Sequence, residues 1–187
     1  GYWTPYVAEE HRTVREAVGV MDMTLMSKFL VQGPHAADVL DRLSANAVVG
    51  EVGKVTYTQW CNERGGIEAD LTVTRLAEDR FLVVASDVIH RRVERMLNDE
   101  PREGEFATVT DVTAGFAILT VQGPHARELL SRVSPDDLSN EGFPYLTARE
   151  VEVGYSRVLT LRVTYLGELG YELYVPSDQA VSVWETL

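Results

Sequence analysis

The sequence predicts an α+β fold built from two tandem βαβββα-type units with mostly antiparallel sheets. The first observation behind this prediction is an internal repeat, because residues 31–36 read Val-Gln-Gly-Pro-His-Ala and residues 121–126 repeat that string. When the chain is aligned on these strings, nine of sixteen positions are identical, which is typical of a duplicated structural unit. The second observation is that three strand-like runs follow one helix in each repeat, an order that favours antiparallel sheets.

The elements of the first repeat can be justified in chain order. A helix is expected at residues 9–17, and residues 28–32 then read as a strand. Gly33 permits a turn, and residues 36–43 place their apolar side chains on one helical face. A second amphipathic helix is expected to close the repeat at residues 88–97. The runs between the two helices that read as strands are residues 55–60, 67–76 and 80–85.

The second repeat follows the same order. Its expected strands and helices are residues 116–122, 126–133, 149–153, 156–164, 171–175 and the segment from 177 onward. A charged stretch with Pro101 and Gly104 is the natural boundary, so the expected domains are residues 1–105 and 106–187. The chain starts with Gly1 and ends in what reads as an unfinished helix, so it is expected to be part of a longer protein.

Composition excludes several classes of function. The 187 residues are 45% hydrophobic and 25% charged, and the longest aliphatic run, 81–85, is too short to cross a bilayer. The formal net charge of −12 repels nucleic-acid phosphates, so neither a membrane nor a nucleic acid is an expected partner. Cys61 is the only cysteine, which excludes an intrachain disulfide.

The strand at residues 67–74 alternates apolar and polar residues. Ile67, Ala69 and Leu71 are expected to face a core, whereas Glu68 and Asp70 face the other way. Either side of the run 55–60 could line a pocket with Asp70. On this pattern alone, a solvated strand face is favoured over a functional site.

The segment 163–174 concentrates three tyrosines, two glycines and two carboxylates. Glycine allows a close backbone approach, tyrosine offers a flat surface, and a carboxylate accepts paired hydrogen bonds from a heterocycle. A site for a flat ligand and a glycine hairpin packed with tyrosines remain equally open from spacing alone.

Other residue types do not form a recognisable site. The four histidines lack metal-ligand spacing, and His35 and His125 occupy equivalent positions in the repeat, so they are expected to be structural and no metal is predicted. No phosphate-binding or dinucleotide-binding glycine motif occurs. The run that ends at Met26 is read first as core filling.

Several segments of the chain, among them residues 28–34, 62–76 and 162–172, resemble the folate-binding aminomethyltransferase family. The archetype of this family is the glycine-cleavage T-protein. The resemblance is closest to the C-terminal folate-binding region of dimethylglycine and sarcosine dehydrogenases and oxidases. It covers essentially the whole chain, and it implies that the family's C-terminal barrel domain is expected to lie outside these 187 residues. The segments that carry the resemblance are residues 14–23, 28–34, 57–59, 62–76, 111–113, 140–144 and 162–172.

The resemblance implies specific roles for five residues. The family's Gly-Gly-x-x-x-Asp pattern falls on Asp70, which would orient the folate amine and handle its proton as a catalytic residue. Glu172 matches the carboxylate that holds the pterin N–H groups, and Tyr57 and Tyr165 match aromatic positions of the folate pocket. Met26 lies where the family has a pocket methionine.

The implied activity is one-carbon transfer to tetrahydrofolate, forming 5,10-methylenetetrahydrofolate from the iminium or formaldehyde product of an N-methyl amine. FAD is expected only in a separate flavin domain, in cis or in trans, and the expected location is the bacterial cytoplasm or the mitochondrial matrix. Three alternatives stay open. They are a stand-alone T-protein-like aminomethyltransferase or demethylase, a methyltransferase that takes methyl groups from sulfonium or aryl ether donors, and a non-catalytic folate-binding assembly factor.

Overall fold

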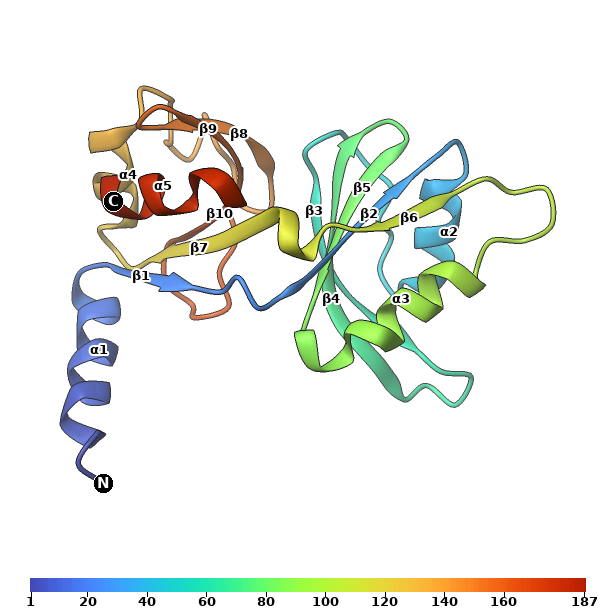
Figure 1. Ribbon diagram of the computed structural model, residues 1–187, viewed down its shortest axis with the longest axis horizontal. Helices are drawn as coiled ribbons and strands as arrows, with labels where there is room; N and C mark the ends of the chain where they lie inside the picture. Colours follow the sequence, from blue (N-terminus) through green and yellow to red (C-terminus); the bar gives the residue numbers. More distant parts are fainter. The chain divides into compact units, whose positions relative to one another are not determined.

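The computed structural model describes residues 1–187 and contains two five-stranded sheets in which all the recorded strand pairs are antiparallel. The chain forms two compact units (Figure 1). The continuous unit is Leu25–Ala114, and the split unit combines Gly1–Thr24 with Gly115–Leu187. The predicted α+β class is therefore confirmed, whereas the grouping by contacts differs from the expected division at residue 105.

The continuous unit contains the sheet order β3-β4-β5-β2-β6. Its buried core includes Phe29, Trp60 and Phe81, and the Trp60 indole N–H donates to Ser44 Oγ at 3.0 Å. A buried indole is stabilised when its single donor has such a partner. The elements are β2 (Ser27–Gln32), α2 (Ala36–Leu43), β3 (Val55–Cys61), β4 (Ile67–Ala77), β5 (Arg80–Ala85), η1 (Asp87–Ile89), α3 (His90–Asp99) and β6 (Thr108–Asp111).

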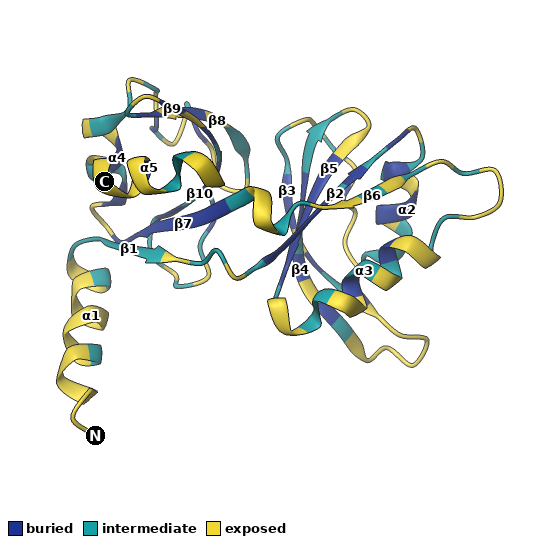
Figure 2. Cartoon of the chain, in the orientation of Figure 1, coloured by how far each residue is buried: buried dark blue, intermediate teal, exposed yellow.

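The split unit has the corresponding sheet order β1-β7-β10-β9-β8. Its core lies on the sheet face that bears Leu119, Val121 and Leu173, whereas α1 has no buried residue (Figure 2). The elements are α1 (Thr4–Glu16), β1 (Gly19–Asp22), β7 (Phe116–Gln122), α4 (Ala126–Val133), β8 (Ala148–Val153), β9 (Ser156–Leu161), β10 (Gly170–Pro176), η3 (Ser177–Gln179) and α5 (Ala180–Thr186). The boundary along the chain between the units falls within η2 (Thr113–Gly115).

The two repeats exchange a strand. β1 precedes the first repeat but pairs with β7 of the second, and β6 precedes the second repeat but pairs with β2 of the first. Neither strand is predicted by the sequence pattern, because each has four residues and its partner lies far away along the chain. This exchange is the physical reason why the split unit includes the N-terminal segment.

The repeated Gly-Pro-His motif fastens these exchanged segments. Gly33 and Gly123 have φ angles of 135° and 132°, which favour glycine. A side chain on either would lie closer than 3.0 Å to a carbonyl oxygen, that of Phe106 or Ala17 respectively. The same carbonyls accept the backbone N–H of His35 at 3.2 Å and of His125 at 3.0 Å.

Several details differ from the expected elements. The first helix, α1, covers Thr4–Glu16 instead of residues 9–17. β9 ends at Leu161 instead of residue 164. Ile67 was expected in the core, yet it is 67% exposed because it lies at the end of the hairpin, next to a register shift at Trp60/Cys61.

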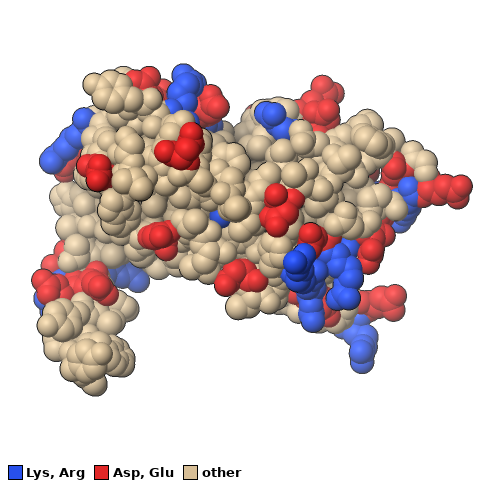
Figure 3. Space-filling view, in the orientation of Figure 1, with Lys and Arg blue, Asp and Glu red and all other residues tan.

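Acidic side chains are spread over many separate points of the visible surface, often beside an Arg or Lys (Figure 3). No helix is long and apolar enough to span a membrane.

Candidate functional site

Asp70 and Tyr57 form a polar pair on the continuous unit. The register aligns Tyr57 with Thr72 and Gln59 with Asp70, so Tyr57 and Asp70 are diagonal neighbours on one face of the sheet. The Tyr57 hydroxyl donates to Asp70 Oδ2 at 2.5 Å. Tyr57 and Gln59 are therefore the residues of β3 that share a sheet face with Asp70, because Trp60 is buried on the opposite face with Ala69.

Both members of this pair remain exposed to solvent. Tyr57 is 51% exposed, and its hydrogen bond to Asp70 raises the pKa of its hydroxyl above the ordinary value of 10.0. Hydrogen bonding leaves Asp70 with acceptor sites for a further partner. Glu68, the other carboxylate of this face, is instead held by Asn62 Nδ2 at 2.7 Å and by an ion pair with Arg92.

Glu172 lies on β10 of the split unit, on the sheet face opposite the core. Its carboxylate accepts a hydrogen bond from the hydroxyl of the fully buried Tyr174 at 2.9 Å. Burial raises the pKa of Glu172 above 4.5 although the Tyr174 bond opposes this shift. Burial also raises the pKa of Tyr174 well above its ordinary value, with the charge of Glu172 adding to the effect.

Tyr165 lies in the same electrostatic environment as Glu172. Partial burial raises the pKa of Tyr165, and the negative charge of Glu172 raises it further. The Tyr165 hydroxyl contacts Met23 Sδ at 3.7 Å, and the side chain is 59% exposed. An exposed ring beside a buried carboxylate is suited to stack on a flat polar ligand.

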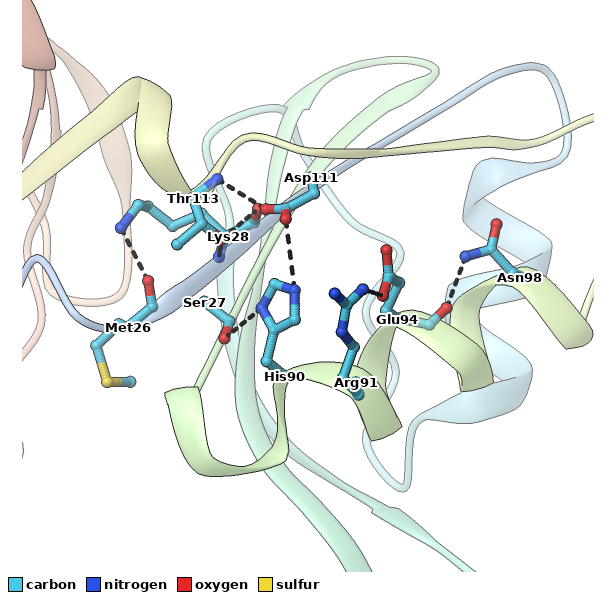
Figure 4. A network of polar contacts seen from close by, with 9 residues as sticks. All are labelled: Met26, Ser27, Lys28, His90, Arg91, Glu94, Asn98, Asp111 and Thr113. Atoms are coloured by element: carbon cyan, nitrogen blue, oxygen red, sulfur yellow. Dashed lines mark hydrogen bonds and ion pairs between the residues drawn. The ribbon is translucent and has the colours of Figure 1, made fainter.

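Met26 occupies a bend just before β2 in the continuous unit. Its carbonyl accepts a hydrogen bond from the buried Lys28 ammonium at 2.8 Å. Figure 4 shows that this contact belongs to a network that fastens β6, in which His90 contacts Ser27 Oγ at 2.9 Å and Asp111 at 3.4 Å. The structure records no hydrogen bond between Met26 and Tyr57 or Asp70.

Asp111 lies in the middle of this network, because its carboxylate accepts the Thr113 backbone N–H at 2.9 Å and lies 3.4 Å from His90 Nε2. Burial opposes its ionisation, but hydrogen bonds from Thr113 together with the charges of His90 and Arg91 outweigh burial and lower the pKa of Asp111 below 3.8. The network therefore has a clear structural role in holding the exchanged strand.

The structure thus brings the predicted residues together in pairs, Tyr57 with Asp70 in one unit and Tyr165 with Glu172 in the other. The hydrogen bond from Tyr174 to Glu172 is not among the predicted contacts, although the spacing of two residues puts both side chains on the same strand face. An open groove of about 740 Å³ lies between α1 and β1 and is lined by none of the predicted residues. No group of three or more His, Cys, Asp or Glu residues is arranged to hold a metal ion.

Comparisons with known proteins place this geometry in context. A family model described as the GCVT N-terminal domain matches residues 1–187. Over 185 residues the chain is 43% identical to a 4-methylaminobutanoate oxidase (formaldehyde-forming) of Paenarthrobacter nicotinovorans, covering 99% of this chain and 22% of the oxidase. It is 38% identical over 181 residues to an aminomethyltransferase of Saccharopolyspora erythraea, covering 96% of this chain and 48% of that protein.

A solved structure supports the fold assignment. The glycine cleavage system aminomethyltransferase T from Bartonella henselae superposes with a TM-score of 0.83 at 28% identity, covering 96% of this chain and 48% of that one. The chain therefore spans about a fifth of the oxidase and about half of each aminomethyltransferase.

Proposed function

The chain belongs to the GCVT N-terminal domain family, and from this premise we propose that it is the tetrahydrofolate-binding, one-carbon-accepting part of an N-methyl amine dehydrogenase or oxidase. The proposed overall product is 5,10-methylenetetrahydrofolate. The resemblance to a formaldehyde-forming oxidase over 99% of the chain supports this choice of enzyme. A flavin domain, in cis or in trans, would supply the oxidation of the methylated amine.

The observation that carries the proposal is the incomplete hydrogen bonding of Glu172. An ionised carboxylate has about four acceptor positions, and the structure records one hydrogen bond to Glu172, from Tyr174. A desolvated carboxylate with free acceptor positions can bind two adjacent N–H groups strongly, because such bonds are charge-assisted. These are the groups that a pterin ring presents, so Glu172 fits the proposed ligand.

The Tyr57–Asp70 pair is suited to proton handling in the same proposal. Asp70 would accept the proton of the folate amine as that nitrogen attacks the one-carbon unit, and the Tyr57 hydroxyl would hold the carboxylate in place. Asp70 is exposed, so a reacting group can reach its carboxylate. Tyr165 would cover one face of the ring, and Met26 would supply an apolar wall.

A second candidate function is stand-alone aminomethyl transfer of the glycine-cleavage type. The 38% identity to an aminomethyltransferase and the TM-score of 0.83 favour it, since the chain covers about half of each of these proteins. The two functions share the folate-binding role and differ in the donor of the one-carbon unit. Either enzyme would work in the bacterial cytoplasm or the mitochondrial matrix.

Calorimetric titration of the chain with tetrahydrofolate under reducing, oxygen-free conditions tests the shared role. Saturable binding is expected, and Glu172→Ala should weaken it strongly. Glu152→Ala is the matched control, because Glu152 is an exposed carboxylate in the same sheet. Equal affinity of the unmodified chain and Glu172→Ala would remove Glu172 from the binding site.

A further inference from the structure

The glutamine of the second Val-Gln-Gly-Pro-His-Ala string is a buried polar group without a partner. Gln122 is fully buried, and neither its Oε1 nor its Nε2 atom has a hydrogen-bond partner. The hydroxyl of Thr120, two residues earlier on β7, is also buried and unpartnered. Buried amides are almost always hydrogen-bonded, so an orphaned one requires an explanation such as a missing ligand.

The sheet register places the Gln122 amide beside Glu172. Gly170 pairs with Gln122 and Glu172 pairs with Thr120, so all four residues lie on one face of the split unit's sheet. A side chain on Gly170 would collide with the Gln122 amide, which shows that the amide extends across the strand over Gly170. Alternate residues on a strand are about 7 Å apart, so the separation of Gln122 and Glu172 along the face is within the length of a fused two-ring system.

The first repeat provides an internal comparison. Gln32 occupies the same position in the motif, but its side chain is only half-buried. In the strand register it lies opposite Arg80 of β5. Two residues after Arg80 the first repeat has Leu82, where the second has Glu172. The orphaned amide therefore occurs only in the repeat that also carries the buried carboxylate.

We propose that Gln122 is a specificity-determining residue, and that its amide binds the carbonyl oxygen on the same heterocycle edge whose N–H groups Glu172 holds. This inference rests on the proposed function and deepens it. A 2-amino-4-oxo pyrimidine edge presents an amino group, a ring N–H and then a carbonyl oxygen. An ionised carboxylate only accepts hydrogen bonds, so the carbonyl oxygen requires a separate donor, which the Gln122 Nε2 group supplies.

Titration of the chain with tetrahydrofolate, combined with thermal unfolding of the ligand-free chain, tests this role. Gln122→Met keeps a similar side-chain length and removes the amide, and it should weaken binding about tenfold. Its unfolding midpoint should be unchanged or higher, because an unpartnered buried amide has been removed. Gln122→Asn, which shortens the side chain by one methylene, should also weaken binding. Gln32→Met is the matched control and should bind like the unmodified chain.

Each other outcome contradicts the proposal. Unchanged affinity in both Gln122 variants would overturn the role of Gln122 while leaving the proposed function intact. A lower unfolding midpoint of Gln122→Met with unchanged affinity would identify a structural role instead. Failure of the unmodified chain to bind tetrahydrofolate would overturn the proposed function and this inference with it.

Discussion

Replacing Glu172 by glutamine is expected to change stability and affinity in opposite directions. The carboxyl is desolvated, its pKa is raised, and its recorded partner is the Tyr174 hydroxyl. Glutamine keeps the shape and an oxygen that accepts this hydroxyl but carries no charge. The ligand-free variant should therefore be more stable at neutral pH, because no charge has to be held in a buried position.

The pH dependence of this effect follows from linkage. Between the ordinary pKa of 4.5 and the raised pKa of the folded chain, the folded state binds more protons than the unfolded state. The stability of the unmodified chain therefore falls as the pH rises through the folded pKa of Glu172. Below the unfolded pKa the carboxyl is protonated in both the folded and the unfolded state, so the stability advantage of Glu172→Gln should disappear.

The effect on tetrahydrofolate affinity is a loss. In the proposed site Glu172 accepts two N–H groups, and the glutamine amide turns one acceptor oxygen into a donor. A hydrogen bond to a charged group contributes about 1.5–3 kcal/mol, so the loss of one such bond should weaken binding roughly tenfold to a hundredfold.

Thermal unfolding from pH 4 to pH 8, together with calorimetric titration at pH 7, measures both effects. A variant less stable than the unmodified chain at pH 7 would refute the reasoning on burial. Unchanged affinity would refute the assignment of Glu172 to the ligand.

The remaining predictions concern the proposed catalytic residue Asp70 and the repeat motif. Asp70→Asn should leave tetrahydrofolate affinity largely intact but slow one-carbon capture by the intact enzyme about a hundredfold, because proton handling is lost while shape is kept; an unchanged rate would make Asp70 a solvated strand residue. Gly123→Ala should destabilise the chain by roughly 2 kcal/mol or more, because its φ angle is positive and a carbonyl oxygen occupies the space. Gly104→Ala is the control in denaturant unfolding, since it has a positive φ angle but open space, and equal losses would show that the carbonyl is unimportant.

How much of the fold the sequence reveals depends on where each strand finds its partner. The apolar run 80–85 coincides with β5, because its neighbours β2 and β4 belong to the same repeat. β1 and β6 escaped detection because each is short and gains its stability by pairing with the other repeat. Hydrophobic periodicity reports burial within a segment but contains no information about such an exchange.

The candidate site was predictable to a similar extent. The alternation of 67–74 places Asp70 away from the core, but it does not reveal which side of β3 accompanies it. The burial of Trp60 decides that question, because it assigns Tyr57 to the face of Asp70. Nothing in the repeated motif distinguishes Gln122 from Gln32, because their difference lies in the strand beside them.

The duplication bears on why the proposed site residues divide between the repeats. The strand registers make Tyr57 and Asp70 equivalent to Glu150 and Arg157, which form an exposed ion pair at 3.1 Å. An exposed ion pair contributes little to stability, so this position tolerates either a surface pair or a reactive one. The first repeat therefore has the Tyr57–Asp70 pair, which the proposed function uses for proton transfer, where the second has a surface ion pair. At the position of Glu172 the second repeat has the buried carboxylate, and the first repeat has the apolar Leu82. Swapping the two charges of this pair, by Glu150→Arg together with Arg157→Glu, should consequently leave tetrahydrofolate affinity unchanged in the calorimetric titration.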